Sequence, residues 1–287
     1  MDTTPVDRAT AAAFEAAEAR AWQDVYAAAP AEFAEAAGLG TRYLGGTLVL
    51  RWLESGRRYF SRTIGLGVTE PATPEAIDDV LDGYERLGIS MFLVQSLPHC
   101  EPPEYEAWLR ERGLEPFDRQ DRVARGSEPF EPGGAAALPV EKVTAETADE
   151  WADFLRRAYR LDTGDWLQAL IGRPGWHEYV ARDGGAIVGA RGMYVGADGT
   201  AWLGMDAPVP GVHGPIYDPM RRSASSWSPT GSSTAHAVSS PTSRRRPTRW
   251  TRRPTSTSRV SASRGRTSAR TGRTWSAANT DADLRPK

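Results

Sequence analysis

The sequence predicts an α/β fold, with helices around mixed sheets, arranged as two tandem domains. Two observations predict this arrangement: helix and strand patterns alternate through both halves, and a Gly- and Pro-rich segment, GSEPFEPGGAAALP, separates them. A third observation, a Ser/Thr/Arg-rich composition, sets the C-terminal end apart. We therefore predict an N-terminal domain over 1–125, a linker over 126–139, a truncated C-terminal domain over 140–222 and a disordered basic tail over 223–287.

The first half begins with an Ala-rich segment, 9–29, whose large apolar residues share one helical face. Segments 43–44, 47–53 and 58–68 then predict an antiparallel meander. Thr73 caps the next helix, which Pro74 opens. A short apolar strand (91–94), a helix ending at Gly113 and a strand (114–123) complete the domain.

The second half repeats this order but stops early. Residues 147–150 (TADE) predict a capping box before an amphipathic helix, and Asp165 opens a shorter helix. Strand 176–181 leads into a hairpin over 185–206, with its turn at 196–199. The helix, strand, helix and strand that complete the first half have no counterpart here, so we expect the second domain to be incomplete.

The charge is divided unevenly along the chain. The net charge of −2 combines residues 221–287, with 15 basic and 2 acidic residues, and residues 1–220, with 20 basic and 35 acidic ones. The single Cys100 excludes an internal disulfide. No leader-like segment or apolar run of about 20 residues occurs, so we expect a cytoplasmic protein without a membrane partner.

The C-terminal tail cannot build a core. Residues 221–287 hold 26 Ser or Thr, one Leu and no Ile, Phe or Tyr. One interpretation is a native tail that binds nucleic acid through its arginine runs. We prefer a frameshift: in a back-translation with G- and C-rich codons that we chose, one nucleotide restored near Arg222 yields the missing helix, strand, helix and strand. Nucleic acid is then not an expected partner.

The chain resembles the GNAT superfamily of N-acetyltransferases in a tandem, two-domain form. The resemblance rests on GAIVGARGMYV, TAWLGMDAPVP and GRPGW in the second half, and on YFSRTIGLGVTEPATPEAIDDVLDGYERLG, FLVQ and WLRERGLEPF in the first. It covers residues 41–125 and 142 to about 222. It implies a degenerate first copy and a catalytic second copy that uses acetyl-CoA as cosubstrate.

This resemblance also implies site residues. The pantetheine arm of acetyl-CoA would pair with the backbone of Trp202, Leu203, Gly204 and Met205. A backbone N–H of Gly204 or Met205 would stabilise the developing oxyanion, and Asp206 would act as the base. The alternative role for Asp206 is an Asx turn at the strand exit.

The segment after this strand departs from the superfamily's pyrophosphate loop, Arg/Gln-x-x-Gly-x-Gly/Ala. Gly211, Val212 and Gly214 stand in its place, with no Arg before Arg221 and with prolines that remove backbone donors. The equivalent first-half segment, 68–74, also lacks the motif and adds the negative charge of Glu70.

An aromatic set could line a pocket for the acceptor amine or pack in the core. Its members are Trp166, Trp176, Tyr179, Tyr194 and Trp202. We expect no metal. The predicted function is acetyl transfer from acetyl-CoA to an amine of a small molecule or protein, impaired by the incomplete second domain. The alternative is a non-catalytic protein that binds a small molecule or a partner.

Overall fold

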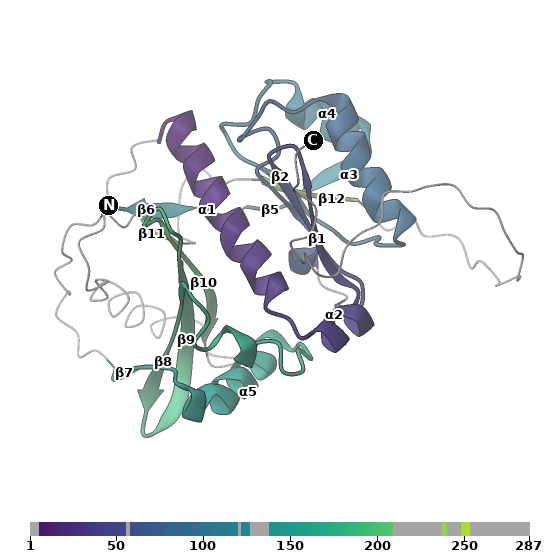
Figure 1. Ribbon diagram of the computed structural model, residues 1–287. Coiled ribbons are helices and arrows are strands. Elements are labelled where there is room, and N and C mark those ends of the chain that lie inside the picture. Colours follow the sequence, from purple (N-terminus) through teal and green to yellow (C-terminus); the bar gives the residue numbers. More distant parts are fainter. Residues whose placement is uncertain are drawn as a thin grey trace, which may run out of the picture. The chain divides into compact units, whose positions relative to one another are not determined.

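The structure is a computed structural model. It describes residues 6–55, 58–119, 122–126, 138–208, 237–239 and 248–252. Helices and strands alternate along these residues, and the sheets are largely antiparallel (Figure 1). The predicted α/β fold class is therefore confirmed.

The chain forms two compact units whose division differs from the predicted one. Unit 1 combines Met1–Phe33 with Arg119–Pro247, and unit 2 combines Ala34–Asp118 with Thr248–Lys287. The difference arises because helix α1 (Arg8–Ala27) belongs to unit 1 and not to the N-terminal meander. Its Trp22 ring lies 5.9 Å from that of Trp202, and its Asp24 carboxylate accepts a hydrogen bond from Arg173 Nε at 2.6 Å.

Unit 2 contains the predicted meander and the helices that follow it. Its elements are α2 (Ala31–Ala37), β1 (Leu39–Leu44), β2 (Thr47–Trp52), η1 (Arg58–Phe60), β3 (Thr63–Ile64), α3 (Pro74–Arg86), β4 (Val94–Ser96), α4 (Tyr105–Glu111), β5 (Leu114–Arg119) and β12 (Thr248–Arg252). The predicted cap of α3 is confirmed, because Thr73 Oγ1 accepts a hydrogen bond from the backbone N–H of Ala76 at 3.1 Å.

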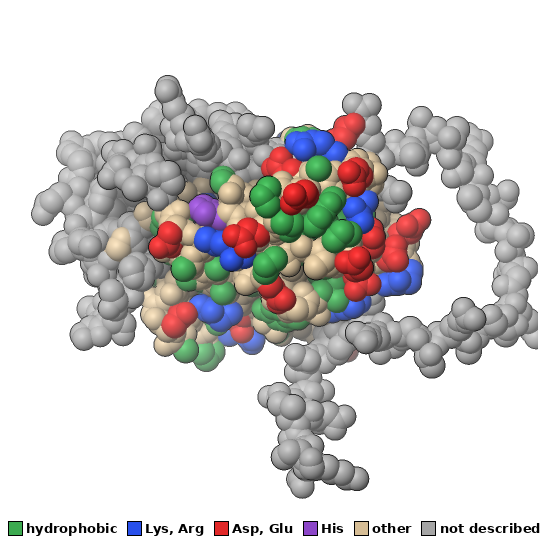
Figure 2. Space-filling view, turned by 90° about the horizontal axis from the view of Figure 1, so that it is seen from above, with side chains coloured by type: hydrophobic (Ala, Val, Ile, Leu, Met, Phe, Trp, Pro, Cys, Tyr) green, Lys and Arg blue, Asp and Glu red, His purple; other side chains and the backbone are tan. Residues whose placement is uncertain are grey.

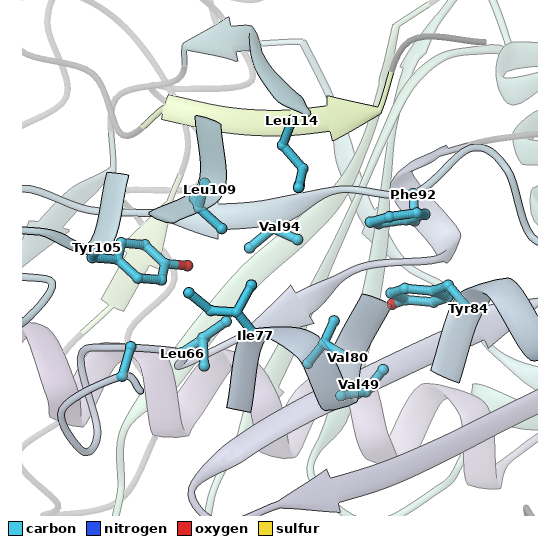
Figure 3. Packing of buried hydrophobic residues seen from close by; sticks show 11 residues of the cluster. Val49, Leu66, Ile77, Val80, Tyr84, Phe92, Val94, Tyr105, Leu109 and Leu114 are labelled. Carbon is cyan, nitrogen blue, oxygen red and sulfur yellow. The ribbon is translucent and has the colours of Figure 1, made fainter. Parts of the chain in front are cut away.

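The core of unit 2 forms where α3 and α4 pack on the strands (Figure 3). The rings of Tyr84 and Phe92 stack with their centroids 4.4 Å apart, and the Tyr84 hydroxyl donates a hydrogen bond to the Leu50 carbonyl at 2.9 Å. Tyr84 therefore fills the core and satisfies its polar atom, as a buried tyrosine must.

Unit 1 is organised on a six-stranded sheet in the order β6-β11-β10-β9-β8-β7. Its elements after α1 are β6 (Val123–Arg125), β7 (Val140–Lys142), η2 (Ala145–Thr147), α5 (Ala148–Tyr159), η3 (Gln168–Leu170), β8 (Trp176–Asp183), β9 (Ala186–Val195), β10 (Ala201–Pro208) and β11 (Ala237–Ser239). The helix expected after Asp165 is only the short 3₁₀ turn η3. The capping interaction lies one turn earlier than predicted, with the Thr144 backbone N–H donating to Thr147 Oγ1 at 3.0 Å.

Two segments of the predicted tail are strands. β11 pairs in parallel with β10 and antiparallel with β6, while β12 lies between β4 and β5. The expectation of irregular coil therefore does not hold at 237–239 and 248–252, because the backbone of any sequence can hydrogen-bond to an open sheet edge. A parallel strand also stands beside β10, where the sequence analysis expected none.

Candidate functional site

The β9–β10 hairpin has the predicted turn. The Gly196 N–H donates to the Thr200 carbonyl and the Gly199 N–H to the Gly196 carbonyl, both at 2.9 Å. Asp198 fixes the turn further, because its carboxylate accepts from the Thr200 N–H at 3.0 Å and from Arg20 of α1 at 2.6 Å. The turn sets the register that brings Gly204 opposite Gly192.

A β-bulge interrupts β10 directly after this glycine pair. Gly204 pairs with Gly192 and Ala207 with Ala190, so two residues of β10 oppose Arg191 alone. The first of the two, Met205, has a φ of 54°, which a side chain other than glycine rarely adopts. Bulges re-aim side chains and interrupt pairing, and this one turns Asp206 toward Arg191.

Asp206 forms a bidentate ion pair with Arg191. The guanidinium Nε and Nη2 donate to the two carboxylate oxygens at 2.6 and 3.0 Å, and the Tyr159 hydroxyl donates to the Asp206 backbone carbonyl at 3.2 Å. Arg191 is buried, and the Asp206 side chain is 20% exposed. The predicted base thus has both oxygens occupied, and this arrangement favours a role in anchoring the bulge.

Glu178, the third residue of β8, is a buried carboxylate without a hydrogen-bond partner. Only 2% of the residue is exposed, and neither side-chain oxygen has a partner among the residues that the structure describes. Burial raises the pKa of Glu178 to about 8, because desolvation disfavours its charged form. Gly192 provides the space: a Cβ there would lie 2.6 Å from Glu178 Oε2. Such a group is typical of functional sites.

Glu178 is not among the site residues predicted from the sequence, although one signal points to it. Alternation along β8 places Glu178 on the same face as Trp176 and Val180, both of which are buried. A carboxylate between two core positions of one strand is an unusual pattern. That pattern could have identified the residue. Only the folded structure shows that its carboxylate has no hydrogen-bond partner.

Three aromatic side chains form a wall on this face, defined by Trp176, Tyr194 and Trp202. The Trp176 ring lies 5.1 Å from Tyr194 and 6.3 Å from Trp202. Its indole Nε1 donates to Asp24 Oδ1 at 2.7 Å, which fixes the ring. The Trp202 indole lies over Gly204, where a Cβ would be 2.0 Å from ring atom Cη2. Two glycines thus leave room for the carboxylate and the indole.

The other two aromatic residues predicted to line the amine pocket lie elsewhere. Trp166 is 1% exposed, its Nε1 donates to the Val25 carbonyl at 2.6 Å and its ring packs on Tyr26, so its role is core packing. Tyr179 follows Glu178 on β8 and faces the opposite side of the sheet. Of the predicted aromatic set, Trp176, Tyr194 and Trp202 therefore form the wall, and Trp166 and Tyr179 do not.

The predicted cofactor residues divide into two groups. Trp202, Leu203, Gly204 and Met205 all lie on β10, but the backbone of Trp202 is already paired with β11. Among the described residues, the pairing with β11 covers only Ala201 and Trp202, and it ends before the bulge at Met205. Gly211, Val212 and Gly214 lie outside the residues that the structure describes.

The loop of unit 2 over 65–70 uses its own backbone donors. The N–H groups of Val68 and Thr69 both donate to the Gly65 carbonyl at 3.0 Å. The Glu70 carboxylate accepts a hydrogen bond from the Gly46 N–H. These internal bonds and the added negative charge disfavour a phosphate at this loop.

The described surface adds two further findings. Acidic and basic side chains are interspersed on the face shown in Figure 2. Within the described ranges, no helix is long and apolar enough to cross a membrane, and no cluster of three or more His, Cys, Asp or Glu side chains could hold a metal ion.

Comparisons with known proteins found likenesses only among solved structures. No family model and no curated protein matches the chain. A GCN5-related N-acetyltransferase from Kribbella flavida is 15% identical, with 73% of this chain and 85% of that chain covered and a TM-score of 0.49. A putative acetyltransferase of the GNAT family from Novosphingobium aromaticivorans is 13% identical, with coverages of 75% and 92% and a TM-score of 0.38. Because these TM-scores lie below 0.5, the function proposed below rests on the sequence motifs and the residues of the site.

Proposed function

We propose that unit 1 is an acyltransferase that transfers acetyl from acetyl-CoA to an amine. The observation that carries the proposal is the unpaired, buried Glu178 carboxylate, which lies over Gly192 of β9, the strand that pairs with the interrupted β10. Acyl transfer to an amine requires a group that accepts a proton and a hydrogen-bond donor for the developing oxyanion. In the sequence, GAIVGARGMYV and TAWLGMDAPVP, which resemble the GNAT superfamily, form the two strands that carry these features.

Each part of the site has a chemical role in this proposal. Acetyl-CoA supplies the acetyl group as a thioester, and the backbone of Leu203, Gly204 and Met205 would hold its pantetheine arm. Glu178 takes one proton from the ammonium of the acceptor and releases the nitrogen lone pair. The amine nitrogen bonds to the acyl carbon, the carbon–sulfur bond breaks, and the second nitrogen proton passes to the thiolate. The products are an amide, free thiol and protonated Glu178.

The basicity of Glu178 suits this step. General bases work best when their pKa lies near the working pH, and burial has raised the pKa of Glu178 to about 8. Asp206, by contrast, is held by Arg191. We therefore assign proton acceptance to Glu178 and positioning of the bulge to the Arg191–Asp206 pair.

The test is thiol release from acetyl-CoA with a panel of primary amines. We expect Glu178→Gln to lower kcat/KM about 100-fold or more, because one positioned base typically contributes 10²–10⁴-fold. Glu146→Gln is the matched control, since this exposed glutamate lies on η2. Acetyl-CoA binding without transfer to any amine would favour the non-catalytic alternative. Transfer that Glu178→Gln leaves unchanged would remove Glu178 from the mechanism.

A further inference from the structure

The face of unit 1 that carries Glu178 combines one unpaired carboxyl group with aromatic surfaces. Glu178 and Trp176 lie two residues apart on β8, and Tyr194 and Trp202 are in register with each other on β9 and β10. All of these side chains except the partly exposed Tyr194 are at least nine-tenths buried. A buried carboxylate gains most from a cation that brings its own apolar surface.

The other charged groups of α1 and β9 near this site are held in ion pairs. On α1, the buried Glu15 and Glu18 both accept hydrogen bonds from Arg122. On α1, Asp24 accepts two hydrogen bonds from Arg173, at 2.6 and 2.9 Å, and one from the Trp176 indole. On β9, Arg191 adjoins Gly192 in sequence, faces the other side of the sheet and pairs with Asp206. Glu178 is therefore the ionisable group that would pair with a positively charged ligand at this site.

We propose that unit 1 binds a compact arylalkyl primary amine as its ammonium ion, with the nitrogen at Glu178 and the apolar part against Trp176 and Trp202. The role of this amine as the acceptor substrate rests on the function proposed above, but binding of the amine can be measured without acetyl-CoA. An amino acid is disfavoured, because its α-carboxylate would lie near Glu178 with like charge. A neutral alcohol of the same shape would leave the carboxylate without a cation.

Trp202 covers the site, and its ring packs in turn against Trp22 of α1, with the two ring centroids 5.9 Å apart. Its indole lies along β10 over Gly204, which has no side chain to hold the ring away from the strand. A ligand that reaches Glu178 displaces this ring and then packs its apolar part on the aromatic surface. Binding should consequently change the tryptophan fluorescence, and Trp202→Phe should reduce that change.

Proton release provides a readout that a merely structural role would not produce. At pH 7 a carboxyl group whose pKa is about 8 holds its proton. Pairing with an ammonium requires it to lose that proton, so binding should release about one proton at pH 7 and almost none at pH 9.5.

The experiment is isothermal titration of the full chain in buffers of different ionisation enthalpy. The probes are phenethylamine, phenylalanine and 2-phenylethanol. We expect phenethylamine to bind at least 10-fold more tightly than the other two, with the proton release given above. Glu178→Gln should weaken phenethylamine binding at least 10-fold and abolish proton release, and Glu146→Gln should change neither.

Three results would overturn the proposal: equal affinity for phenethylamine and 2-phenylethanol, no proton release at pH 7, or full binding by a Glu178→Gln variant with native circular dichroism. Amine binding without acetyl transfer would leave this proposal standing and remove the enzymatic one. Acetyl transfer to amines that do not depend on Glu178 for binding would do the reverse.

Discussion

The Arg191 guanidinium holds both carboxylate oxygens of Asp206 across the bulge in β10, at 2.6 and 3.0 Å. Removing the carboxylate alone leaves a buried guanidinium without its partner, and such changes typically lower stability by 3–5 kcal/mol. We expect Asp206→Ala to lower the free energy of unfolding by about 2–4 kcal/mol in urea, because Asp206 is partly exposed.

The double variant Arg191→Met with Asp206→Ala separates the contribution of the ion pair to the free energy of unfolding from that of side-chain packing. It should recover at least half of the loss, since no unpaired charge remains. If Asp206→Ala is as stable as wild type, the pair does not anchor the bulge.

Stability should fall with rising pH because of Glu178. Its pKa in the folded state is about 8, above the ordinary value of 4.5, so the folded state holds the proton more tightly than the unfolded state. This contribution is fully present below about pH 4.5 and is lost as the pH rises through 8. Relative to wild type, Glu178→Gln should gain stability between pH 5 and pH 8, on the order of a few kcal/mol. Parallel chemical denaturation curves at pH 5, 6.5 and 8 measure the difference, and a constant offset would contradict the assignment.

Gly192 is required by the position of the Glu178 carboxylate. An added Cβ would lie 2.6 Å from Oε2, so either the carboxylate or the strand must shift. We expect Gly192→Ala to lower the unfolding free energy by about 1–3 kcal/mol, the range for overpacked interiors. Glu178→Ala in the same chain should remove the clash, and its failure to restore part of the stability would point to a different cause.

The strand β11 should protect its neighbours from hydrogen exchange. It is the central strand between β10 and β6, where proline cannot be accommodated without loss of a backbone donor. Val238→Pro should accelerate amide exchange in β10 and β6, and the β1–β2 pair of unit 2 serves as the internal control. Unchanged exchange in β10 would show that this strand is dispensable, as the frameshift interpretation predicts for residues without a selected role.

Local patterns predicted the elements whose signals are local. The turn at 196–199 and the Thr73 cap depend on residues a few positions apart, and both form as expected. The assignment of α1 to unit 1 could not be predicted, because it depends on Asp24 meeting Arg173 across 149 positions. The bulge could not be predicted either, because Met205 has a positive φ, which a methionine rarely adopts.

The candidate site follows the same division. Its strands and the role of Tyr194 near Trp176 could be anticipated from alternation and aromatic spacing. The sequence could not show which carboxylate is paired, because Asp206 and Glu178 differ only in the groups that the folded chain places beside them. A sequence motif located the hairpin, but the hydrogen-bond partners of the two carboxylates determine which of them can accept a proton.

Unit 1 can fold only after segments that the ribosome makes far apart in time are all present. Its first helix is synthesised long before β8, β9 and β10, and β11 arrives last. Until β8 and β10 have been made, the apolar face of α1, with Trp22 and Val25, lacks the sheet that covers it, and contacts between such distant segments form slowly. A nascent chain that stalls before residue 208 would therefore expose this helix, which makes α1 the expected binding site for chaperones during synthesis.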